Sequence, residues 1–111
     1  MEQIILFNSK SEMANKLQDR QIVQVLIDGQ KFNLTRHGDQ VIIFELKCPH
    51  FEYPLNQAKV NPFGEVVCPW HNYQFNLHSG EEKEDRCRNL WMKQATWNQE
   101  SQCIIELTKA E

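Results

Sequence analysis

Two short segments of the sequence carry residue types that bind metals. Cys48-Pro49-His50 comes first, and Cys68-Pro69-Trp70-His71 follows after seventeen intervening residues. Each segment offers one thiolate and one imidazole next to a proline. Zinc and [2Fe-2S] clusters both accept sulfur and nitrogen donors, so four ligands in this arrangement could hold either.

The order of the ligands helps to separate these two possibilities. Zinc fingers usually place two cysteines together and two histidines together, whereas both segments here mix one Cys with one His. Such mixing is typical of a centre in which two histidines replace two cysteines on one iron of a [2Fe-2S] cluster. The pattern therefore favours the cluster, and a zinc-binding interaction module remains the alternative.

The two segments resemble the C-x-H and C-x-x-H motifs of the Rieske family. The similarity continues in Pro54-Leu55, Gly64-Glu65-Val66-Val67, Phe75 and Ser79-Gly80-Glu81. It implies one [2Fe-2S] cluster as the cofactor. Cys48 and Cys68 would bind the iron that stays ferric, and His50 and His71 would bind the iron that is reduced.

The sequence departs from the family pattern at several positions near the ligands. High-potential Rieske proteins have an extra cysteine in each loop, and the matching positions here are Tyr53 and Trp70. Those proteins also use hydroxyl groups to hydrogen-bond the cluster sulfurs, at positions that match Tyr73 and Phe75. Fewer donors stabilise the reduced cluster less, so we expect a low-potential, oxygenase-ferredoxin-like centre near about −150 mV. Asn72 replaces the usual glycine, and Asn tolerates a left-handed backbone better than other non-glycine residues.

The resemblance implies a soluble one-electron carrier rather than an enzyme. Its partners would be a reductase and a terminal oxygenase or other redox acceptor, and the free chain would be monomeric. An alternative is a Rieske-like small subunit of a nitrite reductase. A hydroxylating oxygenase subunit is not expected. It would need a second iron held by two histidines and a carboxylate. Only His37 and His78 remain besides the cluster ligands, and the chain is too short for a catalytic domain.

The other cysteines, histidines and tryptophans are predicted to have ordinary structural roles. Cys103 is expected in the core and Cys87 as an incidental thiol, while His37 and His78 lie beside glycine-containing turns. Trp91 and Trp97 are expected in the core or on a sheet face. Trp70 lies inside the second ligand segment, where it would shield a cluster from water.

Length and composition are those of a small globular protein. The 111 residues predict a single domain, residues 1–111, with a cluster-binding subdomain at about residues 47–81. Acidic and basic residues are interspersed with a net charge of −3, which argues against nucleic acid as the partner. The mixed run Glu81–Asp85 is predicted to be a solvated loop, or else a docking patch.

The sequence contains neither a recognisable signal peptide nor an apolar run long enough for a membrane span. We therefore expect a cytoplasmic protein with no membrane partner. In that compartment its four cysteines should not form disulfides.

Apart from one helical turn at Ser9–Leu17, the pattern predicts strands. Asp28-Gly29 joins Gln21–Ile27 to Lys31–Thr35 as a hairpin, and Val41–Leu46 is expected to be a buried strand. Further expected strands are Glu65–Val67, Tyr73–Phe75, and a closing hairpin of Leu90–Trp97 with Cys103–Leu107. The predicted fold class is all-β. The family resemblance implies a Rieske-type antiparallel β-sandwich base that carries a small subdomain of two Cys/His loops.

Overall fold

The computed structural model describes residues 2–49, 52–69 and 72–107. Its elements in chain order are β1 (Glu2–Phe7), α1 (Lys10–Lys16), β2 (Val23–Ile27), β3 (Gln30–His37), β4 (Gln40–Phe44), the 3-10 helix η1 (Leu55–Gln57), β5 (Lys59–Val60), β6 (Glu65–Val67), β7 (Gln74–Asn76), β8 (Met92–Gln94), β9 (Thr96–Trp97) and β10 (Cys103–Leu107). They form three antiparallel sheets with the strand orders β1-β10-β9, β2-β3-β4-β8 and β5-β6-β7. The prediction of an all-β fold is confirmed.

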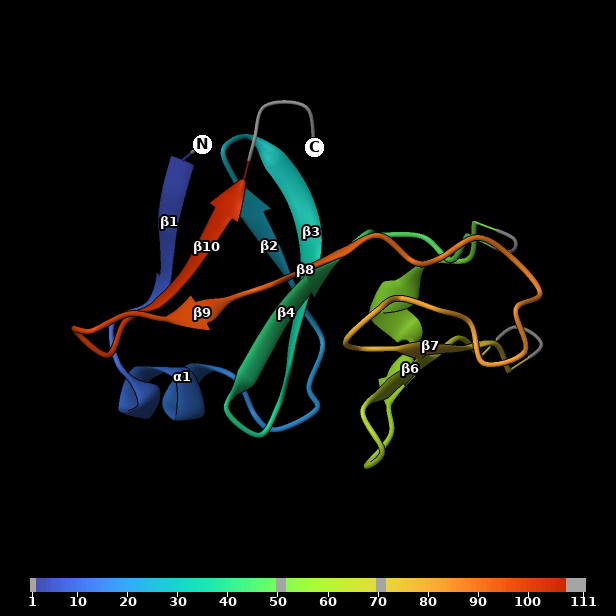
Figure 1. Ribbon diagram of the computed structural model, residues 1–111, viewed down its shortest axis with the longest axis horizontal. Coiled ribbons are helices and arrows are strands. Elements are labelled where there is room, and N and C mark those ends of the chain that lie inside the picture. Colours follow the sequence, from blue (N-terminus) through green and yellow to red (C-terminus); the bar gives the residue numbers. More distant parts are fainter. Residues whose placement is uncertain (1, 50–51, 70–71, 108–111) are drawn as a thin grey trace.

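The four-stranded sheet lies between the other two sheets (Figure 1). Val41 and Ile43 of β4 pack into a core shared with β1, β10 and α1, while Ile42 and Phe44 pack into a second core shared with the small sheet β5-β6-β7. Because successive side chains of a strand point to opposite faces, a strand between two cores must be apolar throughout. This accounts for the continuous apolar run that predicted a buried strand here.

The β2–β3 hairpin forms as the sequence predicts. Asp28 and Gly29 make the two-residue turn, with φ angles of 52° and 82°. Left-handed values at both turn positions match the right-handed twist of the strands that the turn joins, which is why Asp-Gly is favoured there. The hairpin supplies the first two strands of the middle layer.

The helix α1 is capped by Ser9 and closes one end of the sandwich core. The Ser9 hydroxyl accepts a hydrogen bond from the Glu12 N–H at 3.0 Å, and the Glu12 carboxylate accepts one from the Asn8 N–H at 3.3 Å. These reciprocal bonds satisfy donors that the first turn leaves unpaired. Met13 and Leu17, one turn apart, are buried in the core.

The predicted closing hairpin is only partly correct, because Leu90–Trp97 serves two sheets. Met92–Gln94 forms β8 and pairs with β4, whereas Thr96–Trp97 forms β9 and pairs with β10. The chain crosses from one sheet to the other at Ala95, as strands do at the corners of sandwiches. The main partner of β10 is β1, a strand that the sequence reading left unassigned.

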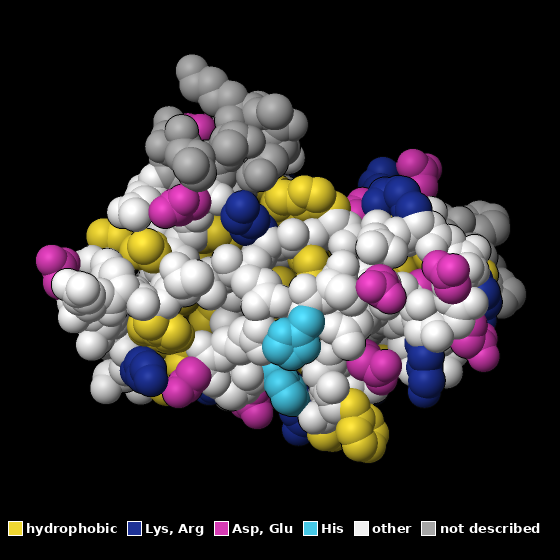
Figure 2. All heavy atoms as spheres, in the orientation of Figure 1, with side chains coloured by type: hydrophobic (Ala, Val, Ile, Leu, Met, Phe, Trp, Pro, Cys, Tyr) yellow, Lys and Arg dark blue, Asp and Glu magenta, His cyan; other side chains and the backbone are white. Residues whose placement is uncertain are grey.

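The small sheet and the chain segments around it extend from one edge of the sandwich (Figure 1). Within the described residues, no helix has the length and apolar character needed to cross a membrane. The charged side chains visible on the small-sheet end are of both signs and intermixed (Figure 2).

Candidate metal centre

Two hairpins of equivalent construction carry the predicted cysteine ligands. In the first, Lys47 pairs with Pro54, and in the second Val67 of β6 pairs with Gln74 of β7. Every member of the second pair lies twenty residues after its counterpart in the first. We call residues 48–53 the first Cys loop and residues 68–73 the second Cys loop.

Each Cys loop is closed by the same backbone hydrogen bond. The Cys48 N–H donates to the Tyr53 carbonyl at 2.8 Å, and the Cys68 N–H donates to the Tyr73 carbonyl at 2.8 Å. Each cysteine thus directly follows a paired residue, Lys47 or Val67, and is the first residue of a six-residue loop. The two Cys-Pro segments therefore begin two loops of matching construction.

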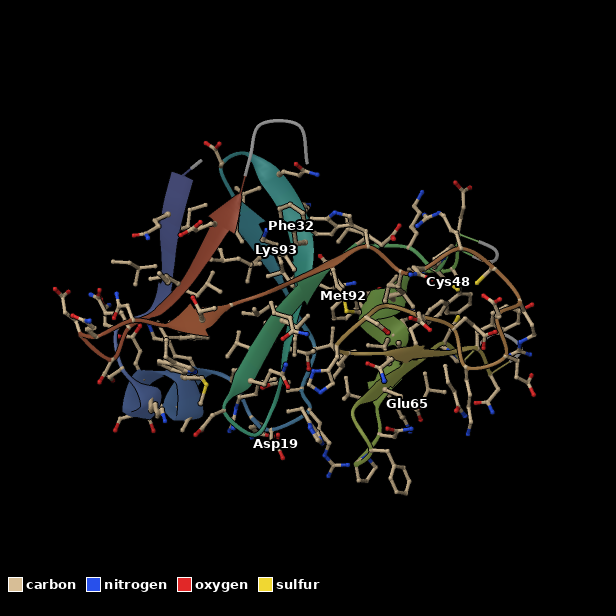
Figure 3. All side chains as sticks on the ribbon, in the orientation of Figure 1. Asp19, Phe32, Cys48, Glu65, Met92 and Lys93 are labelled. Atoms are coloured by element: carbon tan, nitrogen blue, oxygen red, sulfur yellow. The ribbon has the colours of Figure 1, made fainter. Side chains whose placement is uncertain are left out.

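Both cysteine side chains lie inside the core beside the small sheet. Cys48 is 1% exposed and Cys68 is 0% exposed, and they belong to the same group of packed residues as Phe75 and Leu55. No disulfide joins any of the four cysteines, all of which lie in the described part of the chain, as predicted. Two buried thiols in matching loops fit the sulfur half of the donor set of a mixed Cys/His [2Fe-2S] site. Figure 3 shows Cys48 at the end of the molecule opposite β1 and α1.

The two predicted histidine ligands, His50 and His71, lie outside the described residues, as does Trp70. Their assignments stay predictions. Among the residues that are described, no three His, Cys, Asp or Glu side chains come together in a way that could hold a metal ion.

The structure places His37 and His78 at turns, as predicted. The His37 Nε2 lies 2.8 Å from the Pro62 carbonyl, so this ring nitrogen donates and ties the end of β3 to the turn between β5 and β6. The exposed His78 contacts the Gln40 side-chain amide through Nδ1 at 3.2 Å. His37 thus connects the middle sheet to the small sheet, a role that its position in the sequence does not reveal.

The remaining two cysteines differ in their surroundings. Cys103 is buried in the sandwich core, and burial raises the pKa of its thiol to about 11, which keeps it protonated and unreactive. Cys87 is half-buried and packs against the core that contains Cys48. Burial, and after it the nearby Cys48, raises the pKa of Cys87. The prediction of an incidental thiol did not anticipate this closeness to Cys48.

The charged run Glu81–Asp85 is not a fully solvated loop, and in this respect the prediction was wrong. Glu82 is 4% exposed, and its carboxylate forms an ion pair with Arg86 at 2.8 Å. The hydrogen bonds from the Arg86 side chain lower the pKa of Glu82 to about 2, so this buried group stays ionised. A charged run of mixed sign does not show which of its side chains is buried, because the partner of Glu82, Arg86, lies outside the run and four residues further along the chain.

Both aromatic residues that stand at the hydroxyl-donor positions are described. Phe75 is completely buried in the same core as Cys68 and contributes no hydroxyl group to the site. The ring of Tyr73 is covered by the Arg86 guanidinium, with 3.8 Å between the guanidinium carbon and the ring centroid. Neither contact involving Arg86 was predicted from the sequence.

The fold is shared with solved electron-transfer proteins and reductase subunits. The ferredoxin of carbazole 1,9a-dioxygenase from Nocardioides aromaticivorans IC177 superimposes with a TM-score of 0.71 at 17% identity, covering 95% of this chain and 97% of that one. A putative NADH-dependent nitrite reductase small subunit from Mycobacterium tuberculosis gives 0.72 at 18% identity, covering 94% and 93%. A chain of the complex of reduced oxygenase and oxidized ferredoxin in carbazole 1,9a-dioxygenase gives 0.69 at 20% identity, covering 93% and 91%.

The sequence itself matches a family model, that of the Rieske [2Fe-2S] domain, over residues 9–96. This range includes both Cys loops and the seven strands from β2 to β8. The match confirms the predicted cofactor class, a [2Fe-2S] cluster. From the matching hairpins, the buried thiols and this agreement over most of its length, we conclude that the chain belongs to the Rieske [2Fe-2S] domain family.

Proposed function

We propose that this protein is a one-electron carrier whose cluster is held by Cys48, His50, Cys68 and His71. The observation that carries the proposal is the pair of buried cysteines at matching positions of two hairpins. When bound, a [2Fe-2S] cluster supplies a one-electron redox couple. The protein's own residues have to bind it, exclude water from it and leave a path for electrons.

The described residues contribute the two sulfur ligands of this proposal and the apolar surroundings that exclude water. Cys48 and Cys68 present their sulfur atoms from inside a packed core, where apolar neighbours such as Leu55 and Phe75 exclude water. Cys48 lies toward the end of the molecule opposite β1 and α1, which is where we infer that a partner protein approaches (Figure 3). The arrangement serves electron transfer and needs no substrate pocket.

We further propose that residues 1–111 form a single Rieske domain, with a cluster-binding subdomain at about residues 47–81. A reductase would supply the electron, and a terminal oxygenase or another redox enzyme would accept it. The complex of an oxygenase with a structurally similar ferredoxin supports this choice of partner class. On this proposal the protein is a component of a redox system and not an enzyme by itself.

Metal analysis of the purified protein tests the proposal. After expression with adequate iron under anaerobic conditions, the chain is expected to contain about two irons and two acid-labile sulfides, and to be reduced reversibly by one electron. A zinc-binding interaction module would instead be colourless and contain zinc without iron. Stoichiometric zinc under these conditions contradicts the proposal.

A nitrite reductase small subunit is the second candidate, because the TM-score of 0.72 with one putative protein of this kind is close to the 0.71 with a ferredoxin. The two candidates differ in their partners. A mobile carrier should be fully reducible as an isolated chain. When it is mixed with its reductase, it should still elute as a monomer in size-exclusion chromatography. A reductase subunit should co-elute with a larger flavoprotein when the two are expressed together.

A further inference from the structure

Residues 82–88 follow the small sheet; we call this segment the latch. It contacts Tyr73 at the end of the second Cys loop and Glu45, three residues before the first Cys loop begins. It begins beside β7, where Glu82 pairs with Phe75 and the Lys83 N–H donates to the Gln74 carbonyl at 2.8 Å. The latch is therefore attached to the strand that leaves the second Cys loop.

The Glu82 carboxylate closes the latch into a turn. It accepts two side-chain hydrogen bonds from Arg86, at 3.0 Å from Nε and 2.8 Å from a terminal guanidinium nitrogen. It also accepts the backbone N–H groups of Arg86 at 2.9 Å and Glu84 at 3.2 Å. The Glu82 side chain is 0% exposed and that of Arg86 is 35% exposed. The buried Glu82 carboxylate accepts four hydrogen bonds, two of them from the charged guanidinium group, and these hold the Arg86 side chain in one orientation.

Arg86 connects this turn to the second Cys loop. Its guanidinium lies 3.8 Å from the centre of the Tyr73 ring, a distance typical of a cation–π contact. The backbone carbonyl of Tyr73 accepts the N–H of Cys68. A continuous series of contacts therefore runs from Glu82 through Arg86 and Tyr73 to a ligand cysteine.

The other end of the latch contacts the chain segment that leads into the first Cys loop. Arg88 donates two hydrogen bonds to the Glu45 carboxylate, at 2.8 Å and 2.9 Å. Glu45 lies three residues before Cys48, and its carboxylate also accepts the Trp91 N–H. Between the two arginines, Cys87 packs against the core that contains Cys48. Arg86 thus contacts the second Cys loop, Cys87 packs on the core that contains Cys48, and Arg88 contacts the segment before the first Cys loop.

We propose that the latch sets the spacing of the two Cys loops, with Glu82 and Arg86 as positioning residues for the second loop and Arg88 with Glu45 for the first. The proposal rests on the proposed function, since the loops are taken to hold the cluster. It assigns a role to a charged segment that otherwise looks like surface. Neither arginine is a ligand, so each acts through the backbone of a loop.

Cluster loss from the holoprotein tests the latch. The rate is followed by visible absorbance in the presence of an iron chelator. Arg86→Met is expected to increase it roughly tenfold or more, the usual effect of removing a group that orients a metal ligand. Arg86→Lys should fall between the wild type and Arg86→Met, because lysine keeps the charge but lacks the planar fork. Lys83→Met, which removes an exposed neighbouring charge, is the matched control and should leave the rate unchanged.

A double-variant comparison separates positioning from a general loss of stability. If Glu82 acts through Arg86, Glu82→Gln combined with Arg86→Met should lose the cluster no faster than the more severe single variant. Multiplied effects of the two changes, or equal rates for Arg86→Met and Lys83→Met, would overturn the proposal.

Hydrogen exchange measured by mass spectrometry tests the latch independently of the cluster. In the protein as isolated, Arg86→Met should speed exchange in residues 68–73 more than in the sandwich strands β2 and β3. Equal acceleration throughout the chain, or none, overturns the proposal. If the wild type contained no iron-sulfur cluster, the proposed function would fail while this measurement still decided the role of the latch.

Discussion

Glu52 and Asn72 occupy equivalent places in the two Cys loops, and both have a left-handed backbone, with φ angles of 54° and 58°. Each lies four residues after a cysteine and immediately before the tyrosine whose carbonyl closes the loop. The closing turn needs this conformation in both loops. The expectation that Asn72 tolerates a left-handed backbone is thereby confirmed.

The first prediction concerns this shared conformation. Asn72→Gly should leave the stability of the holoprotein nearly unchanged, because glycine adopts positive φ readily. Asn72→Val should cost roughly 1–2 kcal/mol, since a β-branched residue is disfavoured there. Denaturant unfolding of both variants measures the difference. Equal stability of the two variants would show that the turn does not need a left-handed residue.

The second prediction concerns Gly80, where the chain leaves the small sheet. A Cβ atom at this position would clash with the Leu90 carbonyl oxygen, and φ is 78°. Gly80→Ala should therefore push the backbone of residue 80 away from that of Leu90 and lower the free energy of unfolding by about 3 kcal/mol or more. Gly29→Ala is the control, because its φ is 82° but nothing lies within 4 Å of its added Cβ, so only backbone strain of about 1 kcal/mol applies. A Gly80→Ala protein as stable as Gly29→Ala would contradict the close approach.

The third prediction is a pH dependence that originates in Glu82. Hydrogen bonds from Arg86 lower its pKa from 4.5 to about 2 in the folded protein. The ionised carboxylate therefore stabilises the fold fully above about pH 4.5, and this contribution is lost as the pH falls toward 2. At neutral pH, Glu82→Gln should cost about 2 kcal/mol, the usual value of charged hydrogen bonds.

Thermal unfolding midpoints measured across this pH range provide the check. The gap between wild type and Glu82→Gln should be widest near neutrality and should narrow below about pH 4.5. Glu81→Gln, an exposed neighbour, should match the wild type at every pH. A gap that stays constant down to pH values near 2 would refute the linkage.

Some parts of the molecule were predictable from sequence because their signals are local. Asp28-Gly29 determines its hairpin, Ser9 caps its helix, and the apolar run of β4 indicates a strand buried on both faces. The two cysteines that the spacing singled out lie at matching positions of two hairpins, and their role as ligands stays a prediction. These features depend on residues within one turn or one strand of each other.

Other parts depend on contacts between distant segments, which a single sequence does not show. The β1–β10 pairing joins the two ends of the chain, and nothing in Glu2–Phe7 identifies its partner. Leu90–Trp97 is divided into β8 and β9 because its first part pairs with the edge of β4 and its last part pairs with the edge of β10. The burial of Glu82 depends on Arg86 and on the packing of the small sheet, so the charged run looked solvated.

The fourth prediction concerns the redox potential. With Phe75 buried in the same core as Cys68 and providing no hydroxyl group, the wild-type potential should lie near about −150 mV, the low end of the Rieske range. Phe75→Tyr should raise it by tens of millivolts, because a hydrogen bond to a sulfur favours the reduced state. Phe63→Tyr is the control, since Phe63 is 86% exposed on a turn away from the Cys loops and should not change the potential.

Voltammetry between about pH 6 and pH 10 measures both effects. The wild-type potential should be flat near neutrality and should fall only where the histidine ligands of the oxidised state lose protons. A wild-type value above about +200 mV, or the same shift in both Tyr variants, would show that the missing donors do not control the centre.

The fifth prediction concerns the histidine ligands. His71→Ala should abolish or severely destabilise the cluster, because it removes an iron ligand. His78→Ala should keep a full cluster, since His78 is exposed and contacts Gln40 instead. Iron and sulfide content of the two purified variants separates them. Equal contents would show that His71 is not a ligand.

The central claim, a [2Fe-2S] cluster held by two cysteines and two histidines, is tested most directly by pulsed EPR of the reduced wild-type protein. The unpaired electron of the reduced cluster senses magnetic nuclei bound to its irons, so directly coordinated imidazole nitrogens produce strong couplings. The account predicts couplings to two such nitrogens, retained in His78→Ala. A reduced cluster without strong nitrogen coupling, as four cysteine ligands would give, or a protein that contains zinc and no paramagnetic centre, would contradict it.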